Sequence, residues 1–126
     1  TSHIALSHSL LREVLRKGDT VVDATVGNGI DACKLAELVV ESSAGRGQVI
    51  GLDVQKAAIS ATEARLRSKL GEEGVKAHVT LIEANHRDLT CLDGHLPAEG
   101  ANAFVYNLGG QIPSKNNCLT TLFRYS

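Results

Sequence analysis

The chain has 126 residues, which is enough for one domain with a modest hydrophobic core. Its formal net charge is −1 at pH 7, which excludes an overall basic field, although a local basic patch would still suffice for nucleic acid. Three cysteines without C-x-x-C spacing indicate a reducing compartment, cytoplasmic or organellar (plastid or mitochondrial), and no disulfide framework. We see no membrane-spanning apolar run and no signal peptide, so we expect neither a membrane partner nor secretion.

Helical and strand-like patterns alternate along the chain. An apolar stripe predicts a first helix over residues 3–17, which Gly18 ends. The elements predicted after it are strand 21–25, helix 31–40, loop 41–47, strand 48–53, helix 56–70, strand 79–83, a turn-rich stretch at 86–100 and strand 103–108. The last residues show no clear period and are left unassigned. Alternating helices and strands predict an α/β fold of the Rossmann-like kind, with parallel strands flanked by helices.

The turn after the first strand is the strongest functional signal. Gly27 and Gly29 permit a tight turn that opens directly into a helix, an arrangement that brings nucleotide-like ligands onto bare backbone. Residues 27–32 also fit the G-x-G-x-x-G/A pattern of dinucleotide sites. The carboxylates of Asp23 and Asp31 would repel a pyrophosphate, however, and would attract the ammonium and sulfonium of S-adenosylmethionine. The sequence therefore favours S-adenosylmethionine over NAD, with an ordinary β–α turn as the third possibility.

Other polar residues end the later strands, and right-handed crossovers bring all these strand ends to one edge of the sheet. Asp53 can accept hydrogen bonds from both hydroxyls of a ribose, or can simply cap the next helix. Gln55 would flank the adenine or begin that helix in solvent. His86 would lie at the edge of the adenine or of the substrate, against the default of a surface or cap role for a lone histidine. Asn107 would hold a substrate amine or base unless it is only a turn residue.

These residues together resemble the rRNA methylase family of class I methyltransferases, whose members are understood to methylate 5-aminomethyl-2-thiouridine at the tRNA wobble position. Residues 23–31 resemble the family signature D-A-T-x-G-N-G-x-D, and weaker likenesses at 7–9, 51–55, 86 and 104–109 extend the resemblance over about residues 3–110. It implies S-adenosyl-L-methionine as cofactor and tRNA or rRNA as substrate. The residues implied to hold the cofactor are Asp23, Thr25, Gly27, Asn28, Gly29, Asp31, Asp53, Gln55 and His86. Asn107 is implied to face the accepting nitrogen as the catalytic residue.

The end of the chain departs from the family, which continues N-L-G-Y-L-P-G-G-D-K and then adds further strands and helices. We therefore expect an S-adenosylmethionine-binding domain over 1–110, a divergent tail over 111–126 and missing C-terminal strands. Four parallel strands would then leave one sheet edge bare, which favours self-association, for example as a homodimer. The histidines show no metal-ligand spacing, and we expect no metal site.

The leading functional hypothesis is an S-adenosylmethionine-dependent RNA methyltransferase, acting by N-methylation of a modified wobble uridine in tRNA. Two alternatives stay open. One is a fragment of an NAD-dependent oxidoreductase that uses the same glycine turn. The other is a non-catalytic remnant that binds the cofactor without turnover.

Overall fold

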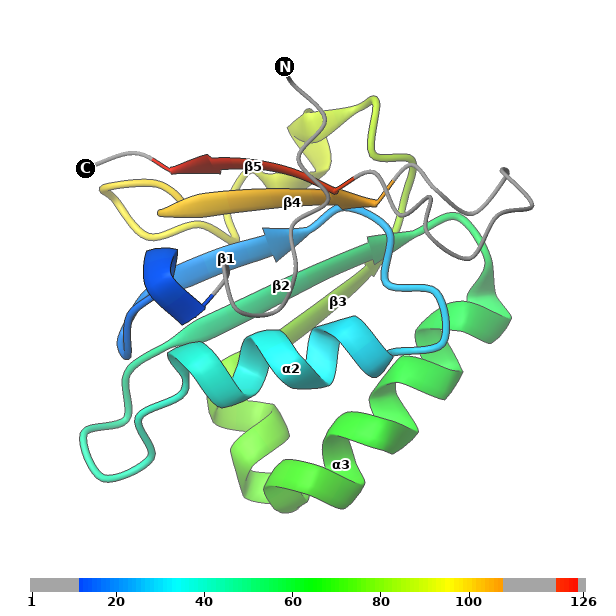
Figure 1. Cartoon of the computed structure of the whole chain (residues 1–126). Helices are drawn as coiled ribbons and strands as arrows, with labels where there is room; N and C mark the ends of the chain where they lie inside the picture. The colour runs from blue at the N-terminus through cyan, green and yellow to red at the C-terminus, as the bar shows by residue number, and fades with distance from the viewer. Residues whose placement is uncertain (1–11, 108–119, 125–126) are drawn as a thin grey trace.

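The computed structural model describes residues 12–107 and 120–124, and within them it shows one five-stranded sheet (Figure 1). The strands are β1 (Thr20–Asp23), β2 (Gln48–Asp53), β3 (Val79–Glu83), β4 (Ala103–Asn107) and β5 (Thr120–Arg124). They lie in the order β3-β2-β1-β4-β5, and the first four are parallel to one another. The predicted Rossmann-like sheet of parallel strands is thereby confirmed.

Strand β5 was not predicted. It pairs antiparallel with β4, with Phe104 opposite Phe123 and Asn107 opposite Thr120. The edge of β4 that we expected to be bare is therefore covered, and this expectation was wrong. The segment is too short to show a period, but its threonines and phenylalanine suit a strand, and the open edge of β4 supplies backbone hydrogen-bond partners. Residues on both sides of the expected boundary at 110 thus belong to one sheet.

The two long helices, α2 (Ile30–Val39) and α3 (Lys56–His78), cover one face of the sheet (Figure 1). Helix α3 was predicted to end at residue 70 and is longer. Gly71, with φ of 79°, breaks it where the stop was expected, but the helix resumes and runs on to β3. The renewed segment packs Val75 against the core, which local sequence signals did not reveal. Of the helix expected over 3–17, residues 12–14 are helical and most of the rest lies outside the described residues.

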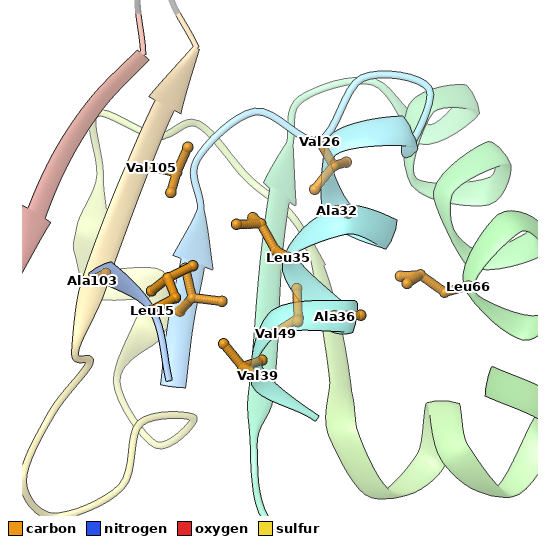
Figure 2. Close-up of a cluster of buried hydrophobic side chains, with 11 residues drawn as sticks. Leu15, Val26, Ala32, Leu35, Ala36, Val39, Val49, Leu66, Ala103 and Val105 are labelled. Atoms are coloured by element: carbon orange, nitrogen blue, oxygen red, sulfur yellow. The ribbon is translucent and has the colours of Figure 1, made fainter. Parts of the chain in front are cut away.

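The core has two parts because alternate strand residues face opposite sides of the sheet. On one side, Val21 and Val49 pack against α2 and α3. Leu35 and Leu66 of these helices are fully buried there, and Figure 2 shows this cluster. On the other side, residues such as Val22 pack against the connection that carries the short 3-10 helix η1 (Leu89–Leu92). Each fully buried leucine contributes roughly 1.5–3 kcal/mol to folding.

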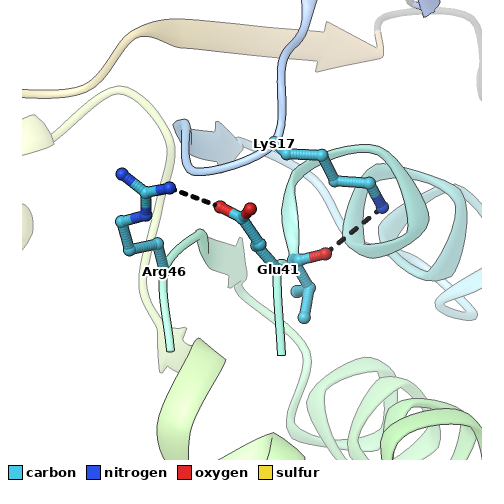
Figure 3. Close-up of polar contacts among 4 residues, drawn as sticks. Lys17, Glu41 and Arg46 are labelled. Atoms are coloured by element: carbon cyan, nitrogen blue, oxygen red, sulfur yellow. Dashed lines mark hydrogen bonds and ion pairs between the residues drawn. The ribbon is translucent and has the colours of Figure 1, made fainter. Parts of the chain in front are cut away.

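Polar contacts surround the C-terminus of α2. The Nζ of Lys17 donates to the carbonyls of Glu37 and Val40 at 2.6 and 3.2 Å, so a cation sits at the helix C-terminus. Figure 3 shows Lys17 bonded to one of these backbone carbonyls. Just beyond the helix, Arg46 pairs with Glu41 at 2.8 Å and closes the exposed 41–46 turn (Figure 3). These contacts set where α2 ends and β2 begins.

Candidate functional site

A cavity of about 1060 Å³ opens where β1, β2 and β3 end. The arrowheads of the four parallel strands point to the same side in Figure 1, as right-handed crossovers require. This volume suits a nucleoside-sized ligand. Six of the predicted residues line it together, namely Thr25, Gly27, Asn28, Asp53, Gln55 and His86.

Part of the lining was missed by sequence reasoning. The first turns of α3 contribute Ala57, Ala58 and Ala61, and these small side chains leave room beside the end of β2. Val54 also lines the cavity and is 57% exposed, which is unusual for a valine. Arg87 adds a cation from the loop after β3. The spacing A-A-x-x-A at residues 57–61 was the available signal, because it places small side chains on one face of the predicted helix.

The glycine turn has the conformation that its sequence predicts. Gly27 and Gly29 have φ of 56° and 91°, and Gly29 is the N-cap of α2. The side chain of Asn28 accepts a hydrogen bond from the Ile30 N–H at 3.1 Å, and the Gly29 N–H donates to the Val26 carbonyl at 2.9 Å. The turn is therefore closed on itself, and its backbone faces the cavity at Gly27.

Helix α3 supports the turn from behind through Thr62, which is fully buried. Its Oγ1 donates to the carbonyl of Gly27 at 3.2 Å. A Cβ at Gly29 would lie 2.8 Å from the Cα of Thr62, so only glycine allows this approach. Thr62 was not predicted, because the contact joins residues 35 positions apart and no local pattern marks it.

Asp53 holds the turn from the side of β2. Its Oδ2 accepts from the Gly27 N–H at 3.1 Å, and its Oδ1 accepts from the Gln55 N–H at 2.9 Å. Each carboxylate oxygen has two acceptor positions, so two remain for a ligand after these backbone bonds. Asp53 does not cap α3, since Gln55 is its N-cap and no side chain bonds there, and the free acceptor positions of Asp53 agree with the ribose role.

Asp23 lies beneath the site at the end of β1 and is only 1% exposed. Its Oδ1 accepts from the Thr25 N–H at 3.2 Å, and its Oδ2 is buried without a hydrogen-bond partner. Burial raises the pKa of this carboxyl to about 8, and the negative charges of Asp31 and Asp53 add to the rise. An unpartnered buried oxygen of this kind fits a site that receives a cationic group.

Not every predicted residue lines the cavity. Asp23, Gly29 and Asp31 do not line it: Asp23 ends β1, Gly29 is the N-cap of α2, and Asp31 lies in the first turn of that helix. Asn107 ends β4, and its side chain lies outside the described residues. In residues 12–107 and 120–124, no cluster of His, Cys, Asp or Glu could hold a metal ion, and no helix there is long and apolar enough to cross a membrane.

Comparison with known proteins gives one family match. The family described as "Putative rRNA methylase" matches residues 49–125, which run from the second residue of β2 through β3, β4 and β5. A chloroplastic tRNA (mnm5s2U34)-methyltransferase from Arabidopsis thaliana is 34% identical over 120 residues, covering 93% of this chain and 42% of the relative. The chain therefore spans less than half the length of this curated relative.

Two solved structures share the fold and a substantial part of the sequence. A "putative rRNA-methylase" from Clostridium thermocellum has a TM-score of 0.63 and 35% identity, covering 96% of this chain and 58% of that one. A "putative methyltransferase" from Streptococcus mutans, solved in complex with SAH, has a TM-score of 0.63 and 30% identity, covering 91% and 56%. Both likenesses extend over nearly the whole of this chain.

Proposed function

The chain belongs to the rRNA methylase family, and we propose that it binds S-adenosylmethionine in the cavity beside the glycine turn and serves methyl transfer to RNA. The observation that carries the proposal is the clustering of six predicted cofactor residues around one nucleoside-sized cavity. The related S. mutans structure contains SAH, the demethylated form of this cofactor. Together these findings favour S-adenosylmethionine over the ligand-free turn that the sequence left open.

The residues present fit the parts of this cofactor. Asp53 has acceptor positions left for ribose hydroxyls, and the adjoining wall of Ala57, Ala58 and Ala61 leaves space for a flat base. The glycine turn presents bare backbone, and Asp31 and Asp53 place negative charge beside it, where an ammonium would be favoured. The cofactor supplies an activated methyl group, so the protein has mainly to orient the acceptor and to exclude water.

For the acceptor we propose the wobble uridine of tRNA, methylated on the nitrogen of its aminomethyl group. The support is the printed activity of the Arabidopsis relative together with the sequence signature at residues 23–31. Asn107, at the end of β4, is proposed to hold the accepting nitrogen. The same relative is chloroplastic, and on that basis we propose an organellar location for this chain.

Calorimetry with SAH and NAD tests the cofactor assignment. We expect SAH to bind and NAD to bind much more weakly, because the negative charges of Asp31 and Asp53 oppose a pyrophosphate at the turn. The alternative has a specific observation in its favour, since Arg87 lines the cavity and could face a phosphate. Tighter binding of NAD than of SAH would therefore overturn the proposal and support the oxidoreductase reading.

Replacing Asp53 tests the ribose role. We expect Asp53→Ala to weaken SAH binding by about 1–3 kcal/mol, because ligand hydroxyls and the Gly27 N–H both lose their acceptor. Calorimetry gives the dissociation constant, and circular dichroism shows whether the variant is folded. Glu83→Ala is the matched control, since it removes an exposed acid from the end of β3. An unchanged dissociation constant in folded Asp53→Ala would refute the ribose role.

A further inference from the structure

One buried carboxyl group in the described part of the chain has an oxygen without a hydrogen-bond partner, and it belongs to Asp23. The other oxygen receives a single backbone N–H, from Thr25, at 3.2 Å. A buried carboxylate needs several donors or a nearby cation to offset the loss of water. Asp23, at 1% exposure, has neither in this geometry, so its neutral form is favoured.

The charged groups packed around Asp23 increase this preference. From the start of α2 comes Asp31, and from the end of β2 comes Asp53, and both are acidic. On its other side the partner in register is Val105 of β4, which is apolar. Within the described residues, then, the charges that act on Asp23 are negative, and the pKa of about 8 agrees with this arrangement.

The two residues that follow Asp23 connect it to the cavity. Ala24 and Thr25 follow Asp23 directly, and both line the cavity. A cation bound at Ala24 and Thr25 would oppose the negative charges of Asp31 and Asp53, and it would favour the carboxylate form of Asp23. On the basis of the proposed function, we propose that Asp23 is neutral in the unliganded protein and ionises when the ammonium of the cofactor binds, so that each binding event releases one proton to solvent.

This inference makes Asp23 a specificity-determining residue. A ligand with an ammonium group gains the attraction of a carboxylate, whereas a neutral nucleoside cannot drive the ionisation. The preference for the cationic ligand should therefore grow as the pH rises, up to the pKa of about 8.

The test is calorimetry of SAH binding to the 126-residue chain between pH 6 and 8, in buffers of different ionisation enthalpy. We expect nearly one proton released per SAH at pH 6–7, and a dissociation constant that falls almost tenfold per pH unit there. The comparison ligand is 5′-methylthioadenosine, which has the adenosine but no ammonium. It should release no proton, and its affinity should not change with pH.

Two variants complete the test. Asp23→Asn should abolish the proton release and the pH dependence. Asp19→Asn removes a buried carboxyl from the opposite end of β1 and should retain both. If Asp23→Asn does not fold, the inference is tested by carbon-13 NMR of the unliganded wild-type chain. The Asp23 carboxyl should then titrate near pH 8, and titration near its ordinary pKa would overturn the inference.

The outcomes separate this inference from the proposed function. Binding of SAH without proton release, or with equal release from both nucleoside ligands, would overturn the role of Asp23 and leave the cofactor assignment intact. Proton release that persists in folded Asp23→Asn would also overturn it. A chain that binds no SAH at all would refute the proposed function and this inference with it.

Discussion

Raising the pH from 4 to 8 is expected to cost the unliganded wild-type chain roughly 3–5 kcal/mol of stability relative to the Asp23→Asn variant. The pKa of Asp23 is about 8 in the folded chain, against 3.8 as the ordinary value. Below pH 4 the carboxyl is protonated in both the folded and unfolded states, so its ionisation makes no difference. As the pH rises, the unfolded chain loses this proton while the folded chain keeps it, which favours unfolding. Above pH 8 both states are ionised and the loss is complete.

Urea denaturation of both proteins at a series of pH values measures this effect. Acids far from Asp23 change the stability of the two proteins alike, so the difference between the curves reports Asp23 together with its coupling to Asp31 and Asp53. We expect the difference to grow steadily between pH 4 and 8 and then to level off. Parallel curves across that range would show that the carboxyl of the folded chain ionises normally, and that its burial is compensated in a way the structure does not reveal.

Gly29→Ala is expected to destabilise the chain by roughly 2–4 kcal/mol and to weaken SAH binding at least tenfold. An alanine Cβ would lie 2.8 Å from the Cα and 3.0 Å from the Oγ1 of Thr62. Neither the helix backbone nor the turn can yield without moving the other, and φ of 91° is unfavourable for any residue with a side chain. The turn should therefore move away from α3, which would break the bond from Thr62 to Gly27.

Gly27→Ala is the matched control for stability. Its φ is also positive, at 56°, but no atom lies within 4 Å of the added Cβ. We expect a loss of only about 1 kcal/mol, which reflects backbone conformation alone. Thermal and urea denaturation of the two variants compare the costs directly. Equal destabilisation would mean that the close approach of α3 to the turn does not constrain the site.

The sheet was the most predictable part of the molecule. Strands β2 and β3 have the predicted bounds, and α2 differs by one residue at each end, because apolar patterning and flanking glycines are local signals. Strand β5 could not be predicted in the same way. Its five residues become a strand because β4 offers an edge, and that edge is a property of the assembled sheet.

The same distinction between local signals and packing applies to the residues of the site. Residue type and position at strand ends were enough to predict that Thr25, Asp53 and His86 would meet. The bond between Asp53 and Gly27 joins residues 26 positions apart, and the burial of Asp23 depends on strands on both sides of β1. Such features arise from packing, so they appear only once the fold is known.

The closed turn at residues 41–46 is a suitable place to attach a label or an affinity peptide. It lies between the end of α2 and the start of β2, whereas the cavity lies where the strands finish, so the two are at opposite ends of the sheet (Figure 1). Residues 42–46 are exposed, and lengthening a surface loop costs little free energy. An affinity peptide or a dye inserted between Ser43 and Ala44 would tether the protein to a sensor surface with the cavity facing the solution.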